Sequence, residues 1–281
     1  MSRLTRTLVV TLSFGVVAGA VQPAPAAAQA PPRPVVVKPQ TPVQPIFLNG
    51  SFGVPLPATD EFTQSASIPF SDEVMSHQSR YQAPSGLFLD GGGGYRFSRW
   101  LGGGIAFSRS GGSKSAAFSL SRPSPYAYNA IVTHDATSRS LDQVQRSVHI
   151  SAVLTPEFGR AYDLMLFVGP SRIYVDQELI TGVDIAESFD GQQYDFAING
   201  PFISQGKVCS CAWGYHVGAD ASRFLTERFG VGGMVRYARA TVDLPNAART
   251  AIGAGEATTR FTAGGLSVAG GLRLRLGRPR F

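Results

Sequence analysis

The sequence has few charged residues and, beyond its first 21 residues, no long apolar run. Only 16% of its 281 residues are Asp, Glu, Lys or Arg, whereas a soluble domain usually has about 25%. A membrane-spanning helix needs about 20 consecutive apolar residues, and no segment after Val21 supplies them. The low charge argues against an ordinary soluble enzyme, and the missing run argues against a bundle of membrane helices.

Cysteine is also scarce, because Cys209 and Cys211 are the only two. A metal site needs about four ligands, so we expect neither a metal nor a cofactor here. In an oxidising compartment the pair can close into a disulfide, although so small a ring is strained. We favour a structural or incidental pair over a redox or metal-binding one.

The formal net charge is +6, which can indicate a nucleic-acid partner. The arginines are scattered in ones and twos rather than gathered in a stripe, so we expect no nucleic acid. Attraction to anionic lipid headgroups is a more natural use of the excess charge.

The N-terminus is typical of a secretory signal peptide. Arg3 and Arg6 precede an apolar stretch over residues 7–21, and Ala28-Gln29-Ala30 has the small-x-small pattern of a cleavage site. A transmembrane anchor is the alternative, but the stretch is short and is followed by prolines. We therefore predict a signal peptide over residues 1–30, a proline-rich periplasmic linker over residues 31–45 and a single domain over residues 46–281.

Within that domain, apolar residues alternate with polar or small ones, which is the period of a strand with one apolar face. Segment 163–175 is apolar on both faces and contains Pro170, so its faces stay unassigned. Most segments have about ten residues or more, enough to cross a bilayer at a tilt. The predicted strands cover residues 46–54, 87–97, 100–109, 143–155, 163–175, 209–221, 229–242 and 262–276.

The connections between these segments alternate strictly between short and long. Short ones occupy residues 98–99, 156–162 and 222–228, and long ones occupy residues 55–84, 110–142, 176–208 and 243–261. A soluble β-sandwich also shows alternating strands, but it has no reason to place every long connection at one end. The pattern predicts an all-β fold: a closed antiparallel up-and-down transmembrane β-barrel of about eight strands, with short periplasmic turns and long extracellular loops.

Three segments carry a resemblance to known proteins: Gly94-Tyr95-Arg96-Phe97-Ser98-Arg99-Trp100-Leu101-Gly102, Gly214-Tyr215-His216-Val217-Gly218, and residues 230–237. They resemble the small outer-membrane β-barrels of the OmpA/OmpX-type and OmpW-like families. The resemblance implies a location in the bacterial outer membrane, with outer-membrane lipid and lipopolysaccharide as surroundings. It also implies that the barrel-assembly machinery recognises the C-terminal Phe281.

If the apolar faces meet lipid, the opposite faces place a set of polar residues in the lumen. A barrel of about eight strands is just wide enough for side chains to fill it. One interpretation is a packed plug in which carboxylates pair with arginines. The other is a narrow hydrated path that selects anions. The predicted set is Asn49, Asp90, Arg96, Gln145, His149, His216, Asp220, Arg236, Arg273 and Arg275.

Two motifs suggest chemistry, and neither is persuasive. His149-Ile150-Ser151 has the H-x-S spacing of lipid A deacylases, but its alternation turns both side chains into the lumen. The segment Asp90-Gly91-Gly92-Gly93-Gly94 lacks the Lys-Ser/Thr of a phosphate loop. The leading hypothesis is a non-enzymatic barrel with a structural or surface-interaction role. A narrow channel for small or hydrophobic solutes is the alternative, and a lipid A-modifying enzyme is third.

Overall fold

The computed structural model describes residues 45–58, 61–70, 72–83, 86–124, 130–156, 161–189 and 196–277. The predicted signal peptide, residues 31–44 of the predicted linker and Phe281 lie outside these ranges.

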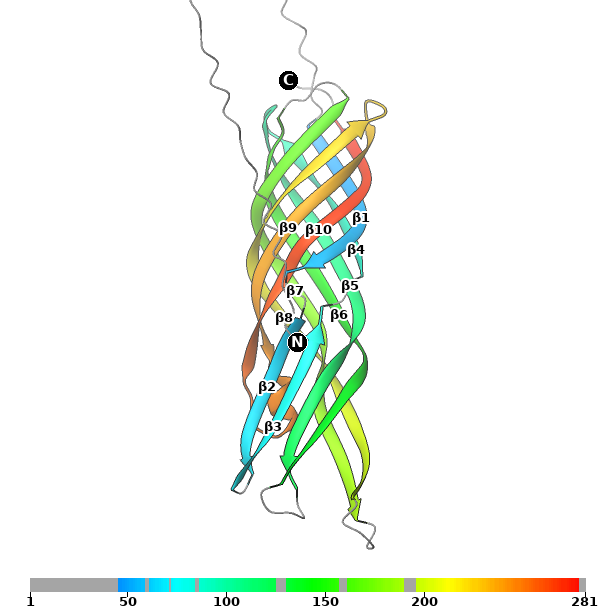
Figure 1. The fold of residues 1–281 in the computed structure, drawn as a ribbon. Coiled ribbons are helices and arrows are strands. Elements are labelled where there is room, and N and C mark those ends of the chain that lie inside the picture. Colours follow the sequence, from blue (N-terminus) through cyan, green and yellow to red (C-terminus); the bar gives the residue numbers. More distant parts are fainter. Residues whose placement is uncertain are drawn as a thin grey trace, which may run out of the picture. The chain divides into compact units, whose positions relative to one another are not determined.

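The described residues form one sheet of ten antiparallel strands and a short helix (Figure 1). The elements are β1 (Ile46–Pro57), β2 (Glu61–Phe70), β3 (Glu73–Gln82), β4 (Leu87–Arg96), β5 (Leu101–Pro123), β6 (Ile131–Leu154), β7 (Tyr162–Phe189), β8 (Phe196–Phe224), β9 (Phe229–Pro245), α1 (Ala247–Ala251) and β10 (Thr258–Leu276).

Eight of these strands close into a ring. Following the hydrogen-bonded pairs, the order is β1, β4, β5, β6, β7, β8, β9 and β10, and β10 pairs again with β1. Every pair is antiparallel, so the predicted fold class, a closed up-and-down barrel, is confirmed. Closure leaves the ring without a free edge at the level where all eight strands pair.

None of the helices in the described ranges is long and apolar enough to cross a membrane.

The short connections are built alike. At the β4–β5 turn, Leu101 N donates to Ser98 Oγ at 3.1 Å. At the β8–β9 turn, Phe229 N donates to Thr226 Oγ1 at 3.0 Å. In both turns the hydroxyl of the second turn residue accepts a hydrogen bond from a backbone N–H that the turn would otherwise leave unpaired. The sequences Phe97-Ser98-Arg99-Trp100-Leu101 and Leu225-Thr226-Glu227-Arg228-Phe229 therefore produce the same tight reversal.

The long connections differ from the prediction, because most of their residues form strands. The β5–β6 and β7–β8 hairpins continue far past the predicted strand ends, and residues 61–82 form a separate hairpin, β2–β3, whose second strand pairs with β5. Helix α1 lies between β9 and β10. The alternation is weaker there because the outer face meets water and need not be apolar. We call this part of the barrel, with β2, β3 and α1, the extension.

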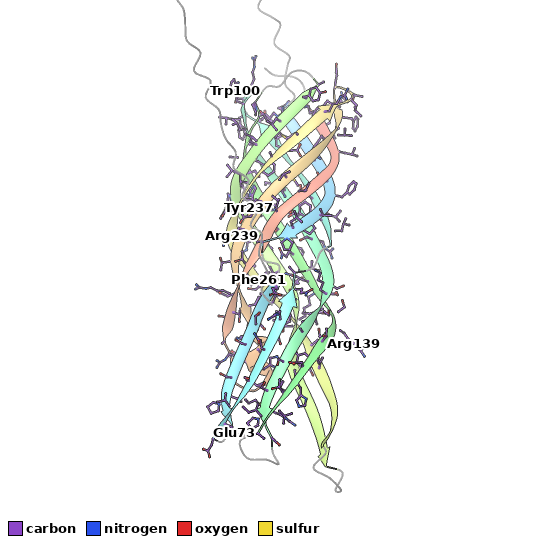
Figure 2. All side chains as sticks on the ribbon, viewed as in Figure 1. Glu73, Trp100, Arg139, Tyr237, Arg239 and Phe261 are labelled. Atoms are coloured by element: carbon purple, nitrogen blue, oxygen red, sulfur yellow. The ribbon has the colours of Figure 1, made fainter. Side chains whose placement is uncertain are left out.

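A belt of exposed apolar side chains surrounds the barrel between the short turns and the extension. On β9, for example, Phe229, Val231 and Val235 are exposed, whereas Met234 and Arg236 are buried. Trp100 lies at the end with the short turns, and Tyr237 lies much farther along the barrel (Figure 2). Membrane barrels present such a belt, about 25 Å tall and bordered by aromatic residues, to lipid.

The interior is filled at three levels. Beside the belt, one buried apolar cluster contains Phe47, Phe88, Phe167 and Met234. A second cluster lies where the belt meets the extension, and its largest members are Ile173, Val175, Val242, Leu244 and Phe261. A third fills the extension, and its largest members are Tyr81, Phe118, Leu141, Leu179 and Ile180. The barrel thus has a continuous core rather than an open bore.

Candidate functional site: the barrel lumen

Three aspartates and four arginines form ion pairs inside the belt. Arg96 pairs with Asp163, and Arg275 reaches the same carboxylate at 2.9 Å. Asp90 pairs with Arg236, and both side chains are almost wholly inaccessible to water. A charge in such a place is tolerated only when it is paired and hydrogen-bonded.

The third pair, Asp220 with Arg273, has the most complete hydrogen bonding. Arg273 Nε donates to both carboxylate oxygens of Asp220, at 3.0 and 2.9 Å. Its Nη1 donates to Ser51 Oγ at 2.9 Å. The planar guanidinium therefore holds a carboxylate and a hydroxyl from two other strands in fixed positions. Such contacts cross the lumen and tie β8, β10 and β1 together.

Two histidines and three serines form a chain of hydrogen bonds across four neighbouring strands, β5 to β8. Ser108 Oγ lies 3.0 Å from His149 Nε2, and His149 Nδ1 lies 2.7 Å from Ser171 Oγ. The same Ser171 Oγ lies 2.8 Å from His216 Nδ1, and His216 Nε2 lies 2.9 Å from Ser151 Oγ. The two imidazole rings meet edge to face with centroids 4.8 Å apart.

The hydrogen bonds of this series of serines and histidines can all be formed with the protons pointing in either of two opposite directions. A neutral imidazole has one N–H donor and one acceptor nitrogen, and a hydroxyl donates once while accepting. All protons can therefore point from Ser108 towards Ser151, or all can point the other way. Within the described ranges, no carboxylate hydrogen-bonds to either imidazole, so the serines lack the oriented base of a Ser-His-Asp triad.

The H-x-S motif does not act as a pair. Both His149 and Ser151 lie on the lumen face of β6, as their alternation indicated. Ser151, however, is bonded to His216, and His149 is bonded to Ser108 and Ser171. Attack on a lipid would require the hydroxyl on the outer wall of the barrel.

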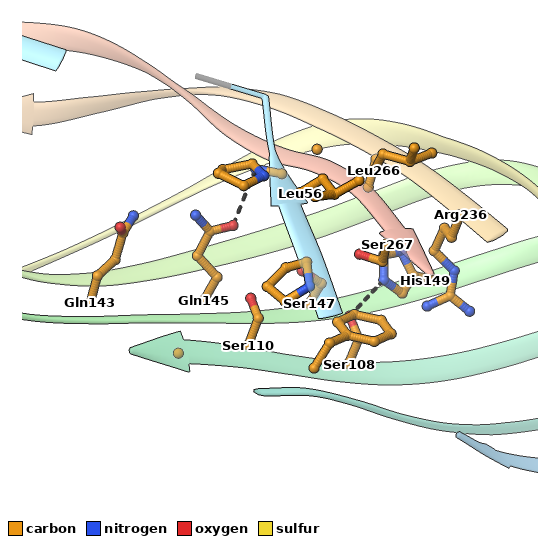
Figure 3. Close-up of a pocket in the computed structure, with 17 residues that line it drawn as sticks. Leu56, Ser108, Ser110, Gln143, Gln145, Ser147, His149, Arg236, Leu266 and Ser267 are labelled. Carbon is orange, nitrogen blue, oxygen red and sulfur yellow. Dashed lines mark hydrogen bonds between the residues drawn. The ribbon is translucent and has the colours of Figure 1, made fainter. Parts of the chain in front are cut away.

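A cavity of about 50 Å³ lies at the Ser108 end of this hydrogen-bonded chain (Figure 3). Its walls include Ser108, Ser147, His149 and Arg236. Gln145 also lines the cavity, and its Oε1 accepts a hydrogen bond from Gly264 N at 3.2 Å. The volume is enough for one or a few water molecules, with several polar groups to hold them.

The cavity reaches the barrel wall where the strand ladder is incomplete. The β1–β4 pairing stops at Gly53, so residues 54–57 of β1 pair with β10 alone. Pro55 and Pro57, which lack an N–H, lie in this unpaired stretch and line the cavity. Across the gap, residues 112–115 of β5 pair with β6 alone. We call the gap between these two stretches the seam.

Of the ten lumen residues predicted from the sequence, seven are buried and Asn49, Gln145 and Arg275 are partly buried. The sequence did not single out Asp163, Ser51, Ser108 or Ser171. Asp163 and Ser171 lie on β7, where inward Met165 and Phe167 are as apolar as the lipid-facing residues. Strand β7 therefore lacks the alternation of apolar and polar residues by which an inward face is recognised in the sequence. The serines gave no signal, because a hydroxyl suits either face of a strand.

No protein-family model matches the sequence. No curated protein matches it either. Among solved structures, Neisserial surface protein A is 13% identical, with 82% of this chain and 97% of that chain covered and a TM-score of 0.42. The outer membrane protein OprG from Pseudomonas aeruginosa is 12% identical, with 84% and 98% covered and a TM-score of 0.46.

The outer membrane protease OmpT from Escherichia coli is 10% identical, with 83% of this chain and 97% of that chain covered and a TM-score of 0.44. The structural neighbours are thus small outer-membrane β-barrel proteins, as the sequence resemblance predicted. Identities this low carry no information about activity.

Proposed function

We propose that this chain is a non-enzymatic integral protein of the bacterial outer membrane, with a structural or surface-interaction role carried by its extension. The observation that carries the proposal is the core of the extension. Tyr81, Phe118, Leu179 and Ile180 are almost completely buried there, beyond the apolar belt. Flexible loops would not need such a core, whereas a rigid surface for a partner would.

Polar contacts support the same interpretation, because they fasten the β2–β3 hairpin to the rest of the extension. Ile180 N donates to Tyr81 Oη at 3.1 Å. Gln64 Nε2 donates to Pro245 O at 2.8 Å, and Gln64 Oε1 accepts from Ala247 N at 3.0 Å. The hairpin is thus tied to β7, β9 and α1. The projecting surface is held in one shape before any partner arrives, which lowers the entropic cost of binding.

Conductance across a planar lipid bilayer tests this proposal. We expect the refolded chain to insert without unitary current steps, because the ion pairs and apolar clusters fill the lumen. Slower gel migration after boiling in detergent would show that the inserted protein is a closed barrel. Steady unitary steps that change in Arg236→Ala would replace the proposal with an ion channel.

A second candidate function rests on the seam. The cavity beside it touches Pro55, Pro57 and Ser110, so a small solute could leave sideways through the wall. Uptake of glycerol, a solute of only six heavy atoms, into proteoliposomes tests this path. Lateral passage predicts uptake by the wild type that Ser110→Trp abolishes. Thr241→Trp, on the outward face of β9 and away from the seam, is the control and should leave uptake unchanged.

A further inference from the structure

The lipid-facing wall contains a groove that the lumen does not explain. Its volume is about 1010 Å³, and its floor includes Gly50 and Gly91, which face each other across the β1–β4 ladder. The exposed side chains of Phe52, Leu89 and Phe107 form its sides. Elsewhere in the belt, large apolar residues occupy most outward positions. Gly50 and Gly91 therefore leave a hollow between these three apolar side chains.

Crowding does not account for these two glycines. A Cβ at Gly50 or Gly91 would meet nothing within 4 Å. By contrast, a Cβ at Gly94 would lie 2.2 Å from Gly103 O, so that inward position has no room for a side chain. A glycine inside a strand costs conformational entropy and packing, and usually marks a close approach by another group. At Gly50 and Gly91 no such group belongs to the described part of the chain.

The groove ends at a concentration of positive charge. Arg109 and Arg146 both line it, and they lie directly opposite each other across the β5–β6 ladder, where like charges repel. Asp176 is 2.5 Å from Arg146 and 3.9 Å from Lys207, so this carboxylate is shared between Arg146 and a third cation. Arg109 forms no ion pair with any residue in the described ranges.

The position of the two arginines identifies the leaflet. They lie about 20 Å from the periplasmic ends of β5 and β6, given about 3.3 Å per residue and a tilt of about 40°. The belt is about 25 Å tall, so the long arginine stems reach the interface on the side of the extension. With the barrel placed as in the proposed function, its extension outside the cell, this is the outer leaflet, in which the phosphorylated lipid is lipopolysaccharide. An arginine pair suits phosphate because each guanidinium can donate two parallel hydrogen bonds.

We propose that this groove binds the lipid A part of a lipopolysaccharide molecule, with one acyl chain over Gly50 and Gly91 and a phosphate on Arg109 and Arg146. The acyl chain of the lipid then contacts protein on its sides as well as beneath it, and a flat wall could not provide these lateral contacts. The phosphate removes the repulsion between the two arginines. The proposal is independent of the lumen, because it concerns only the outward face of the barrel.

Native mass spectrometry of the refolded full chain in detergent micelles tests the proposal, with diphosphoryl lipid A, its dephosphorylated form and phosphatidylglycerol as probes. We expect lipid A to be retained most tightly. Arg109→Gln should weaken its binding by at least about tenfold, which is about 1.4 kcal/mol, because it removes a charged hydrogen bond to the phosphate. The matched control is Arg260→Gln, at an exposed arginine next to Asp243 on the extension.

Variants that fill the groove with larger side chains give an independent test of the acyl-chain site. Gly50→Leu with Gly91→Leu should also weaken lipid A binding, while Gly233→Leu, at another outward glycine with room for a side chain, should not. The heat-dependent gel shift verifies that each variant is folded. Equal retention of lipid A and phosphatidylglycerol, or equal binding by Arg109→Gln and Arg260→Gln, would overturn the proposal. Loss on dephosphorylation without loss on filling would leave a phosphate site but disprove the acyl-chain groove.

Discussion

The buried pair of Asp90 and Arg236 allows a quantitative test of how the lumen is stabilised. The side chains are 0% and 5% exposed, respectively, so water cannot replace either partner. Arg236→Met leaves the carboxylate of Asp90 buried and uncompensated, which typically costs 3–5 kcal/mol. Replacing both residues, as Asp90→Val with Arg236→Met, removes both desolvation penalties. That double variant should unfold with nearly the wild-type free energy, or a higher one.

The assay is urea-induced unfolding of the refolded barrel in lipid vesicles, followed by tryptophan fluorescence. Trp100 and Trp213 are both exposed on the outer wall, so their emission reports departure from lipid. Arg139→Met, at an exposed arginine on the extension, is the control and should change the free energy of unfolding by less than about 0.5 kcal/mol. A loss below about 1 kcal/mol in Arg236→Met, or a double variant as unstable as the single one, would refute the reasoning.

Three further predictions concern single positions. Burial lowers the pKa of His77 on β3 to about 4. Because the unfolded hairpin binds the proton near pH 6.5, the free energy of opening the hairpin should fall by about 3 kcal/mol between pH 6.5 and pH 4, measured as lower amide protection factors over residues 61–82. The pKa of the Cys209 thiol is raised by its hydrogen bond to Asp176, so alkylation of Cys209 at pH 7.5 should accelerate in Asp176→Asn. Gly94→Ala should destabilise the barrel by several kcal/mol in urea unfolding, because its Cβ would meet backbone, whereas Gly91→Ala should not.

Each of these predictions has a contradicting result. Equal amide protection factors for residues 61–82 at pH 4.5 and pH 7.5, after correction for the intrinsic pH dependence of exchange, would remove the role of His77. An unchanged alkylation rate would show that Asp176 does not hold the thiol proton. Equal unfolding midpoints for the Gly91 and Gly94 variants would mean that the wall is less tightly packed at Gly94 than the distances indicate.

The sequence was sufficient for the fold of the membrane-spanning part because each strand reports its own surroundings. On β10, Leu272 and Leu274 alternate with Arg273, since one face meets lipid and the other the lumen. The alternation of short and long connections then required every hairpin to reverse at a fixed end. The residue alternation and the lengths of the connections are both local features, so they can be read from the sequence without knowing which strands pair.

The same local signals failed where both faces meet similar surroundings. On β7, inward Phe167 is as apolar as outward Val168, because the inward side chain packs in a buried apolar layer. In the extension, the outer face meets water, so the β2–β3 hairpin and the long hairpins gave no apolar stripe and were predicted as loops.

Only the closed barrel decided which groups meet. Arg273 could have paired with any inward carboxylate, and the offset between neighbouring strands places it against Asp220, 53 residues earlier. That same offset aligns His149 with Ser171, and it sets Gly50 beside Gly91 on the outer wall. Which face a residue occupies is a property of its own strand, whereas its partners depend on the registers of all eight strands together, since a one-residue slip in any of them would change every contact across the lumen.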